Sequence, residues 1–192
     1  LEKDKIKQMY DSLGDEFLFS QAKLNGVSSI TGHALSIVLG EDNLPSHWLE
    51  EYEEINERIS SYMNELEKVA RLLDKNGIQL LALKNSGITK GLYPYHGSCP
   101  MGDVDVLVSK TVFRQAHTIL TDAGYKLKFR SPLEEDNIEA AEHGGGAEYS
   151  VTLDNGEHLW FELQWRPVAG RWIQPEQEPQ VDDLIKRSKP IN

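Results

Sequence analysis

The feature that most constrains the fold is one run of seven residues, Gly102-Asp103-Val104-Asp105-Val106-Leu107-Val108. The alternation of apolar and acidic residues predicts a strand whose valines pack into a core from one face. The two aspartates then project from the other face, with their Cα atoms about 6 to 7 Å apart. Like charges at this spacing repel unless a cation or strong hydrogen-bond donors lie between them. The run therefore predicts a strand that carries a cation-binding pair, Asp103 and Asp105.

A third acid, Glu162, lies within a later apolar run, Leu159-Trp160-Phe161-Glu162-Leu163-Gln164-Trp165. If the two strands are neighbours, Glu162 completes a three-carboxylate site for Mg²⁺ or Mn²⁺. Magnesium ions roughly 3.5 to 4 Å apart, which hold the attacking and leaving oxygens of a phosphoryl transfer, need such ligands. Glu162 could also accept the proton of the attacking hydroxyl. An Asp-x-Asp pair alone is common in solvated loops, and it is the apolar setting and the third acid that favour metal binding here.

The periodicity of the chain predicts helices followed by mixed elements. Helices are expected at 3–23 with an interruption at Gly14, 28–39, 46–75, 86–92, 112–123 and 181–188. Strands are expected at 78–83, 103–108, 125–129, 148–153 and 158–165. The Asn155-Gly156 turn predicts that the last two strands form a hairpin. We therefore expect an α+β protein with three parts: an N-terminal helical region at 1–76, a core at 77–173, and a linker at 174–192 that begins a C-terminal helical region continuing beyond the sequence.

Composition restricts location and partners. The formal net charge of −11 disfavours bulk nucleic-acid binding, which needs a basic footprint. Cys99 is the only cysteine, which excludes an intrachain disulfide and indicates a reducing, cytoplasmic compartment. The sequence has no uncharged apolar run long enough to span a membrane, so no membrane partner is expected. Because the first residue is Leu1, the chain is expected to be a fragment.

Several ordered motifs carry a family resemblance. They are Leu81-Ala82-Leu83-Lys84, a short helix ending at Tyr93-Pro94, Pro100-Met101 followed by the two-aspartate strand, a helix ending at Ala123-Gly124-Tyr125, and Phe161-Glu162-Leu163-Gln164-Trp165-Arg166. This order resembles a poorly characterised bacterial nucleotidyltransferase family of the polymerase-beta-like superfamily. The resemblance implies a mixed sheet flanked by helices. It also implies transfer of a nucleoside monophosphate from ATP or another triphosphate to a hydroxyl of a small molecule, peptide or protein. Asp103, Asp105 and Glu162 would be the catalytic, metal-binding acids, and Lys84, Asn85, Ser86 and Gly102 would contact the nucleotide.

The sequence departs from the family pattern at three places. Asn85 replaces the glycine after the lysine, no arginine precedes Pro100, and Gln164 replaces a histidine. A glutamine forms hydrogen bonds but does not act as an acid or base near neutral pH. These departures leave two alternatives to an active enzyme: a catalytically weakened module that binds nucleotide or a partner, and an antitoxin-like regulator that acts through its long N-terminal helix.

Two further features have ordinary interpretations. The run His143-Gly144-Gly145-Gly146 could offer amides to a phosphate, but no helix is expected after it, so we expect a loop that borders the substrate. Trp172, next to Arg171, could stack on a nucleobase, although packing is the commoner role of a tryptophan.

Overall fold

The structure is a computed structural model that describes residues 3–93, 95–168 and 177–190. The contacts divide the chain into two compact units, one made of residues 1–60 and 93–100 and the other of residues 61–92 and 101–192. Each unit is described by itself. The three-part division expected from the sequence remains a prediction, and its boundary at 173–174 falls outside the described residues.

The first unit is helical. Its elements are α1 (Lys3–Leu13), α2 (Asp15–Leu24), α3 (Ser28–Leu39), the 3-10 turns η1 (Glu41–Asn43) and η2 (His96–Ser98), and the first half of α4 (Ser46–Asp74). The expected first helix is divided at Gly14, whose φ of 79° lies in the left-handed region that glycine adopts without a steric cost. Trp48 of α4 is fully buried, and its Nε1 donates a 2.7 Å hydrogen bond to Asp15 at the start of α2. This buried tryptophan therefore ties α2 to α4.

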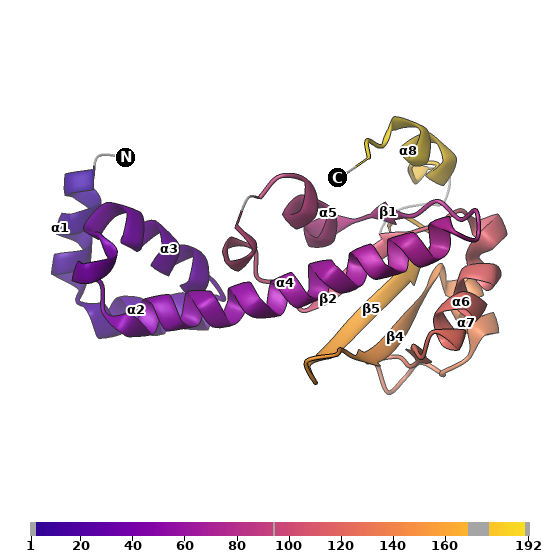
Figure 1. The fold of residues 1–192 in the computed structure, drawn as a ribbon, viewed down its shortest axis with the longest axis horizontal. Coiled ribbons are helices and arrows are strands. Elements are labelled where there is room, and N and C mark those ends of the chain that lie inside the picture. The colour runs from indigo at the N-terminus through magenta and orange to yellow at the C-terminus, as the bar shows by residue number, and fades with distance from the viewer. Residues whose placement is uncertain (1–2, 94, 169–176, 191–192) are drawn as a thin grey trace. The chain divides into compact units, whose positions relative to one another are not determined.

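The second unit contains a five-stranded mixed sheet in the order β1-β2-β5-β4-β3. The strands are β1 (Leu81–Ala82), β2 (Asp103–Leu107), β3 (Lys126–Leu127), β4 (Gly146–Thr152) and β5 (His158–Gln164). Only the β2 and β5 pair is parallel among the described strands. The helices of this unit are the second half of α4, α5 (Lys84–Gly91), η3 (Lys110–Val112), α6 (Phe113–Asp122), α7 (Ile138–Gly144) and α8 (Val181–Arg187). Figure 1 shows β4 and β5 side by side, with α6 and α7 next to them.

The core of this unit lies against one face of the sheet. Phe161 of β5 and Tyr149 of β4 are fully buried there, and Tyr125 packs edge-on against both rings. Two helices supply polar contacts to the same aromatic cluster: Glu65 of α4 accepts a hydrogen bond from the Tyr125 hydroxyl, and His117 of α6 is 2.8 Å from the Tyr149 hydroxyl. Apolar burial on this face leaves the acidic side chains of β2 and β5 on the other face.

The structure confirms an α+β fold with a mixed sheet, the hairpin of β4 and β5, and the helix near the C-terminus. Two expected strands are much shorter than predicted. At 78–83 only Leu81–Ala82 is a strand, because the amide of Ile78 bonds to the carbonyl of Leu73 and closes α4 instead. At 125–129 only Lys126–Leu127 is a strand, because the amides of Phe129 and Arg130 bond to side-chain carboxylates.

The prediction that residues 143–146 form a loop was wrong. His143 and Gly144 are the last residues of α7, and Gly146 is the first residue of β4. Gly145 ends the helix with a φ of 106°, and a Cβ at that position would lie 2.5 Å from Arg166 Cδ. The glycines therefore permit a tight passage from helix to strand. Trp172 lies outside the described residues.

Candidate active site

The parallel pairing of β2 and β5 brings the predicted acids together. Asp105 is opposite Glu162 in this ladder, and Asp103 is opposite Trp160. Residues in register on adjacent strands share a face, and so do residues two apart on one strand. Asp103, Asp105 and Glu162 therefore project from the same face of the sheet, the face that the core leaves free.

Asp105 is held from several sides. Its side chain is only 4% exposed, and its backbone amide donates a 2.9 Å hydrogen bond to Ser86 Oγ. Ser86 is fully buried in α5, so the hydroxyl that the resemblance assigned to the nucleotide is used within the protein. The next residue, Gly87, allows α5 to lie close to β1, because a Cβ there would be 2.7 Å from the carbonyl oxygen of Ala82. Ser86 thus joins α5 to β2, and Gly87 lets the same helix lie close to β1.

Lys84 supplies the nearest cation to Asp105. Its Nζ is 2.5 Å from Asp105 Oδ1 and 3.6 Å from Glu162 Oε2. Partial burial lowers the pKa of the Lys84 ammonium, but the hydrogen bond to Asp105 and the negative charges of Asp105, Glu162 and Asp103 together leave this pKa above its usual value. Lys84 is the one described non-glycine residue with a positive φ, 47°. Such a backbone costs free energy and is most often found at functional sites.

Arg130 is a site residue that the sequence reasoning missed. Its guanidinium donates to Asp103 Oδ2 at 2.7 Å, to Glu148 Oε2 at 3.1 Å and to Glu162 Oε1. Partial burial lowers its pKa, but the carboxylates, Glu148 and Asp103 first, raise it well above the usual value, so the guanidinium stays charged. Glu148, a fourth acid, was also missed. Its position in the expected hairpin, opposite Glu162, was the available signal.

Gln164 stands where the pattern that the motifs resemble has a histidine. It is almost fully buried beside the acids. Its Nε2 donates to Glu162 Oε2 at 2.8 Å and to Asp105 Oδ1 at 3.2 Å. Its Oε1 is buried and makes no hydrogen bond to the described residues. The glutamine therefore links two carboxylates and leaves one buried acceptor open.

Glu162 has an unusual ionisation. Burial and the neighbouring Asp105 carboxylate raise the pKa of Glu162 to about 7, although Lys84 opposes this shift. A carboxyl near neutrality in pKa is suited to exchange a proton at physiological pH. Burial is the larger cause of this shift, ahead of the Asp105 carboxylate.

The remaining predicted residues lie at the edge of this site. Asn85 and Gly102 are both exposed. A Cβ at Gly102 would meet no atom within 4 Å, so the space in front of the strand is open. Neither residue contacts the acids through a hydrogen bond between described residues, and their contact with a nucleotide remains a prediction.

The three carboxylates are the type of ligand that a hard divalent cation prefers. Asp103, Asp105 and Glu162 offer only carboxylate oxygens, which magnesium and manganese prefer. Within residues 3–93, 95–168 and 177–190, no three His, Cys, Asp or Glu side chains are already arranged as a metal site. Arg130 and Lys84 instead compensate the acids. A cation bound here would take over part of the charge compensation that these two side chains provide.

A family model described as an uncharacterised nucleotidyltransferase matches residues 11–192. The chain belongs to this uncharacterised nucleotidyltransferase family. The match confirms the resemblance seen in the motifs, and family membership supports transfer of a nucleoside monophosphate as the general activity. No curated protein and no solved structure gives a significant match.

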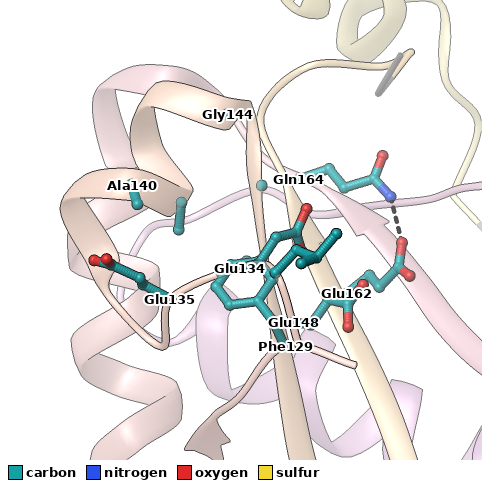
Figure 2. A pocket seen from close by; sticks show the side chains of 12 residues that line it. Phe129, Glu134, Glu135, Ala140, Gly144, Glu148, Glu162 and Gln164 are labelled. Atoms are coloured by element: carbon teal, nitrogen blue, oxygen red, sulfur yellow. Dashed lines mark hydrogen bonds between the residues drawn. The ribbon is translucent and has the colours of Figure 1, made fainter. Parts of the chain in front are cut away.

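Two hollows flank the acids of this nucleotidyltransferase. One, of about 910 Å³, is lined by Lys84, Lys90, Lys186 and Lys189, by one acid, Glu67, that is paired with Lys90, and by apolar side chains of α4, β1 and α5. The other, of about 480 Å³, is lined by Glu162 and Gln164 and is shown in Figure 2. Among the described helices, none is long and apolar enough to cross a membrane.

Proposed function

We propose that this protein is a metal-dependent nucleotidyltransferase with a polymerase-beta-like core. It would move a nucleoside monophosphate from a nucleoside triphosphate to a hydroxyl of an acceptor. The observation that carries the proposal is the register of Asp105 with Glu162 on adjacent parallel strands, with Asp103 on the same face. Three carboxylates in this arrangement repel one another, and magnesium or manganese would relieve that repulsion.

Asp103, Asp105 and Glu162 are the residues that would hold the metal. When bound, magnesium would offset the charge of the triphosphate and polarise the phosphorus that is attacked. Lys84, whose ammonium already lies between Asp105 and Glu162, would contact the phosphates as a point charge. Arg130 would move from the acids to the phosphates, since a guanidinium binds either group in a forked geometry.

The proposed reaction is a substitution at the α-phosphorus. The acceptor hydroxyl oxygen forms a bond to this phosphorus, and the bond from the phosphorus to the oxygen that bridges to the β-phosphate breaks. Pyrophosphate leaves with the electron pair of that bond. Glu162 would accept the hydroxyl proton, and Gln164 would hold the Glu162 carboxyl in place through its 2.8 Å hydrogen bond.

The test is transfer of labelled nucleotide. The chain of residues 1–192 is incubated with magnesium, α-phosphate-labelled ATP, GTP, CTP or UTP and candidate acceptors, and the labelled product is counted. Asp103→Asn and Asp105→Asn should each lower the rate by about 100-fold or more, because each removes a charge that acts on the transition state. Asp122→Asn, an exposed change at the end of α6, is the matched control. Equal rates in the wild type and both site variants would refute the proposal.

One observation favours a second function, nucleotide binding without transfer. Arg130 and Lys84 together form ion pairs with all three acids, so the protein itself compensates part of their charge. Calorimetry decides between the two functions. The binding module would be supported by two results together: magnesium does not increase the affinity for the triphosphate, and no acceptor receives nucleotide.

The cytoplasm is the proposed location. The proposal rests on the single cysteine of the sequence, Cys99, which is typical of proteins in a reducing compartment. The acceptor is a small molecule, a peptide or a protein, and bulk nucleic acid is disfavoured by the net charge of −11.

A further inference from the structure

The smaller of the two hollows is lined in part by Glu162, the proposed catalytic acid. Glu162 and Gln164 of β5 line one side, and Glu135 and Ala140 line the opposite side (Figure 2). Small residues leave this space open: Ala140, Ala141 and Gly144 of α7, and Gly146 and Ala147 of β4. Its volume of about 480 Å³ lies in the range of pockets that bind small molecules.

The lining of this hollow is strongly acidic. Glu134, Glu135, Glu148 and Glu162 contribute to it, and the described residues that line it include no Lys, Arg or His. Glu148 and Glu162 share Arg130, whereas Glu134 and Glu135 are exposed and form no ion pair with the described residues. The carboxylates of Glu134 and Glu135 are therefore without a cation partner among the described residues.

Polar and apolar side chains both line this hollow. Gln164, which is only 4% exposed, lines it, and the buried Oε1 of its amide has no hydrogen-bond partner among the described residues. Phe129 and Leu133 supply an apolar wall.

The two hollows have opposite charge. The lysine-lined hollow suits the polyanionic triphosphate, and the glutamate-lined hollow suits a substrate that carries positive charge. Lys84 lines the first and Glu162 the second, and these side chains are 3.6 Å apart. The acids that would carry the chemistry therefore lie at the junction of the two hollows.

We propose that the glutamate-lined hollow is the acceptor site, and that it takes a small molecule carrying both a hydroxyl and a protonated amine. The inference rests on the proposed function, because that function places the attacked phosphorus beside Glu162. The hydroxyl would lie at Glu162, the ammonium at Glu134 and Glu135, and the carbon skeleton against Phe129 and Leu133.

The experiment measures binding without nucleotide, so that its result does not depend on turnover. Glucosamine, glucose and glucuronate have similar size and differ in charge, and ligand-observed NMR with the full chain gives the affinity for each. Glucosamine should bind roughly tenfold more tightly than glucose, the effect expected of two favourable charge contacts, and glucuronate should bind most weakly. Equal binding of the three sugars, or a preference for glucuronate, would overturn the inference.

Variants of the hollow provide the second arm. Gly144→Leu should abolish glucosamine binding, because a Cβ there meets no atom within 4 Å and the added side chain enters open space without strain. Ala140→Leu, an exposed position on the same wall, is the substitute if the first variant does not fold. Ala123→Leu, at the exposed end of α6 and away from the hollow, is the size control. Undiminished binding in a folded pocket variant would overturn the inference.

A paired change of charge completes the test. Glu134→Gln with Glu135→Gln should lower glucosamine affinity roughly tenfold and leave glucose affinity unchanged. Glu53→Gln with Glu54→Gln changes the net charge equally on an exposed part of α4 and should alter neither. If the sugars bind as expected but no labelled nucleotide is transferred to any acceptor, the proposed transfer fails and the amine-binding site stands.

Discussion

The ammonium of Lys84 lies 2.5 Å from Oδ1 of Asp105, and Lys84 reaches it from a backbone with a φ of 47°. The chain turns from β1 into α5 at this residue, so the strained backbone and the ion pair occur at the same position. Lysine is therefore held here against its backbone preference. This is the pattern expected when a side chain is retained for its charge.

A comparison of two substitutions separates the backbone from the charge. Lys84→Ala and Lys84→Gly both remove the ammonium, but only glycine accepts a positive φ without a steric cost. We expect the free energy of unfolding of Lys84→Gly to be about 1 kcal/mol larger than that of Lys84→Ala. Urea denaturation measures this difference. A more stable alanine variant would contradict the assigned backbone conformation.

The guanidinium of Arg130 competes with any cation for Asp103 and Glu162. Because Arg130→Gln removes a positive charge from these carboxylates, the variant should bind manganese more tightly than the wild type, by roughly tenfold. Calorimetry without nucleotide gives both dissociation constants. Arg114→Gln removes an arginine that pairs with Glu139 and Glu142 instead, and its affinity should equal that of the wild type. Weaker manganese binding by Arg130→Gln would contradict the idea that Arg130 and the metal ion compete for the same carboxylates.

The ionisation of Glu162 predicts a pH dependence of stability in metal-free protein. Burial, and then Asp105, raises its pKa from 4.5 to about 7 in the folded state. Between pH 4.5 and about pH 7, Glu162 is therefore protonated in the native state but already ionised in the unfolded chain. The resulting stabilisation is fully present below about pH 4.5 and is lost as the pH rises through 7, by at most about 3 kcal/mol.

The glutamine variant at this position isolates the effect. Glu162→Gln stays neutral, so the wild type should lose stability relative to it as the pH is raised from 5 to 8. Urea unfolding of both proteins with a chelator present, at several pH values, measures the difference. A constant difference across this range would show that Glu162 does not titrate there.

The hydrogen bond from Tyr125 to Glu65 holds α4 to the aromatic cluster on the sheet. Both side chains are buried, and Tyr125→Phe leaves the Glu65 carboxyl without this donor. We expect the variant to lose about 1 to 3 kcal/mol of unfolding free energy, the cost of an unsatisfied buried acceptor. Tyr93→Phe, at a position that is 42% exposed, should change stability little and serves as the control in the same thermal scan.

Local patterns in the sequence were sufficient for several parts of the fold. The alternation around Asp103 and Asp105 predicted β2, and the Asn155-Gly156 turn predicted the β4–β5 hairpin. These predictions succeeded because side-chain periodicity and turn chemistry act between residues that are close in sequence. The short strands were overestimated because the amides of Ile78, Phe129 and Arg130 bond to groups that no periodicity reveals.

By itself, the sequence determined the family, the α+β class and the acids that could carry chemistry, because these depend on residue types in a fixed order. Only the tertiary structure decided what surrounds those acids. It placed Arg130 across Asp103 and Glu162, buried Gln164 between two carboxylates, and opened a hollow lined by glutamates beside Glu162. These contacts join residues far apart in the chain, and they form only when the sheet, α7 and the loop before it pack together.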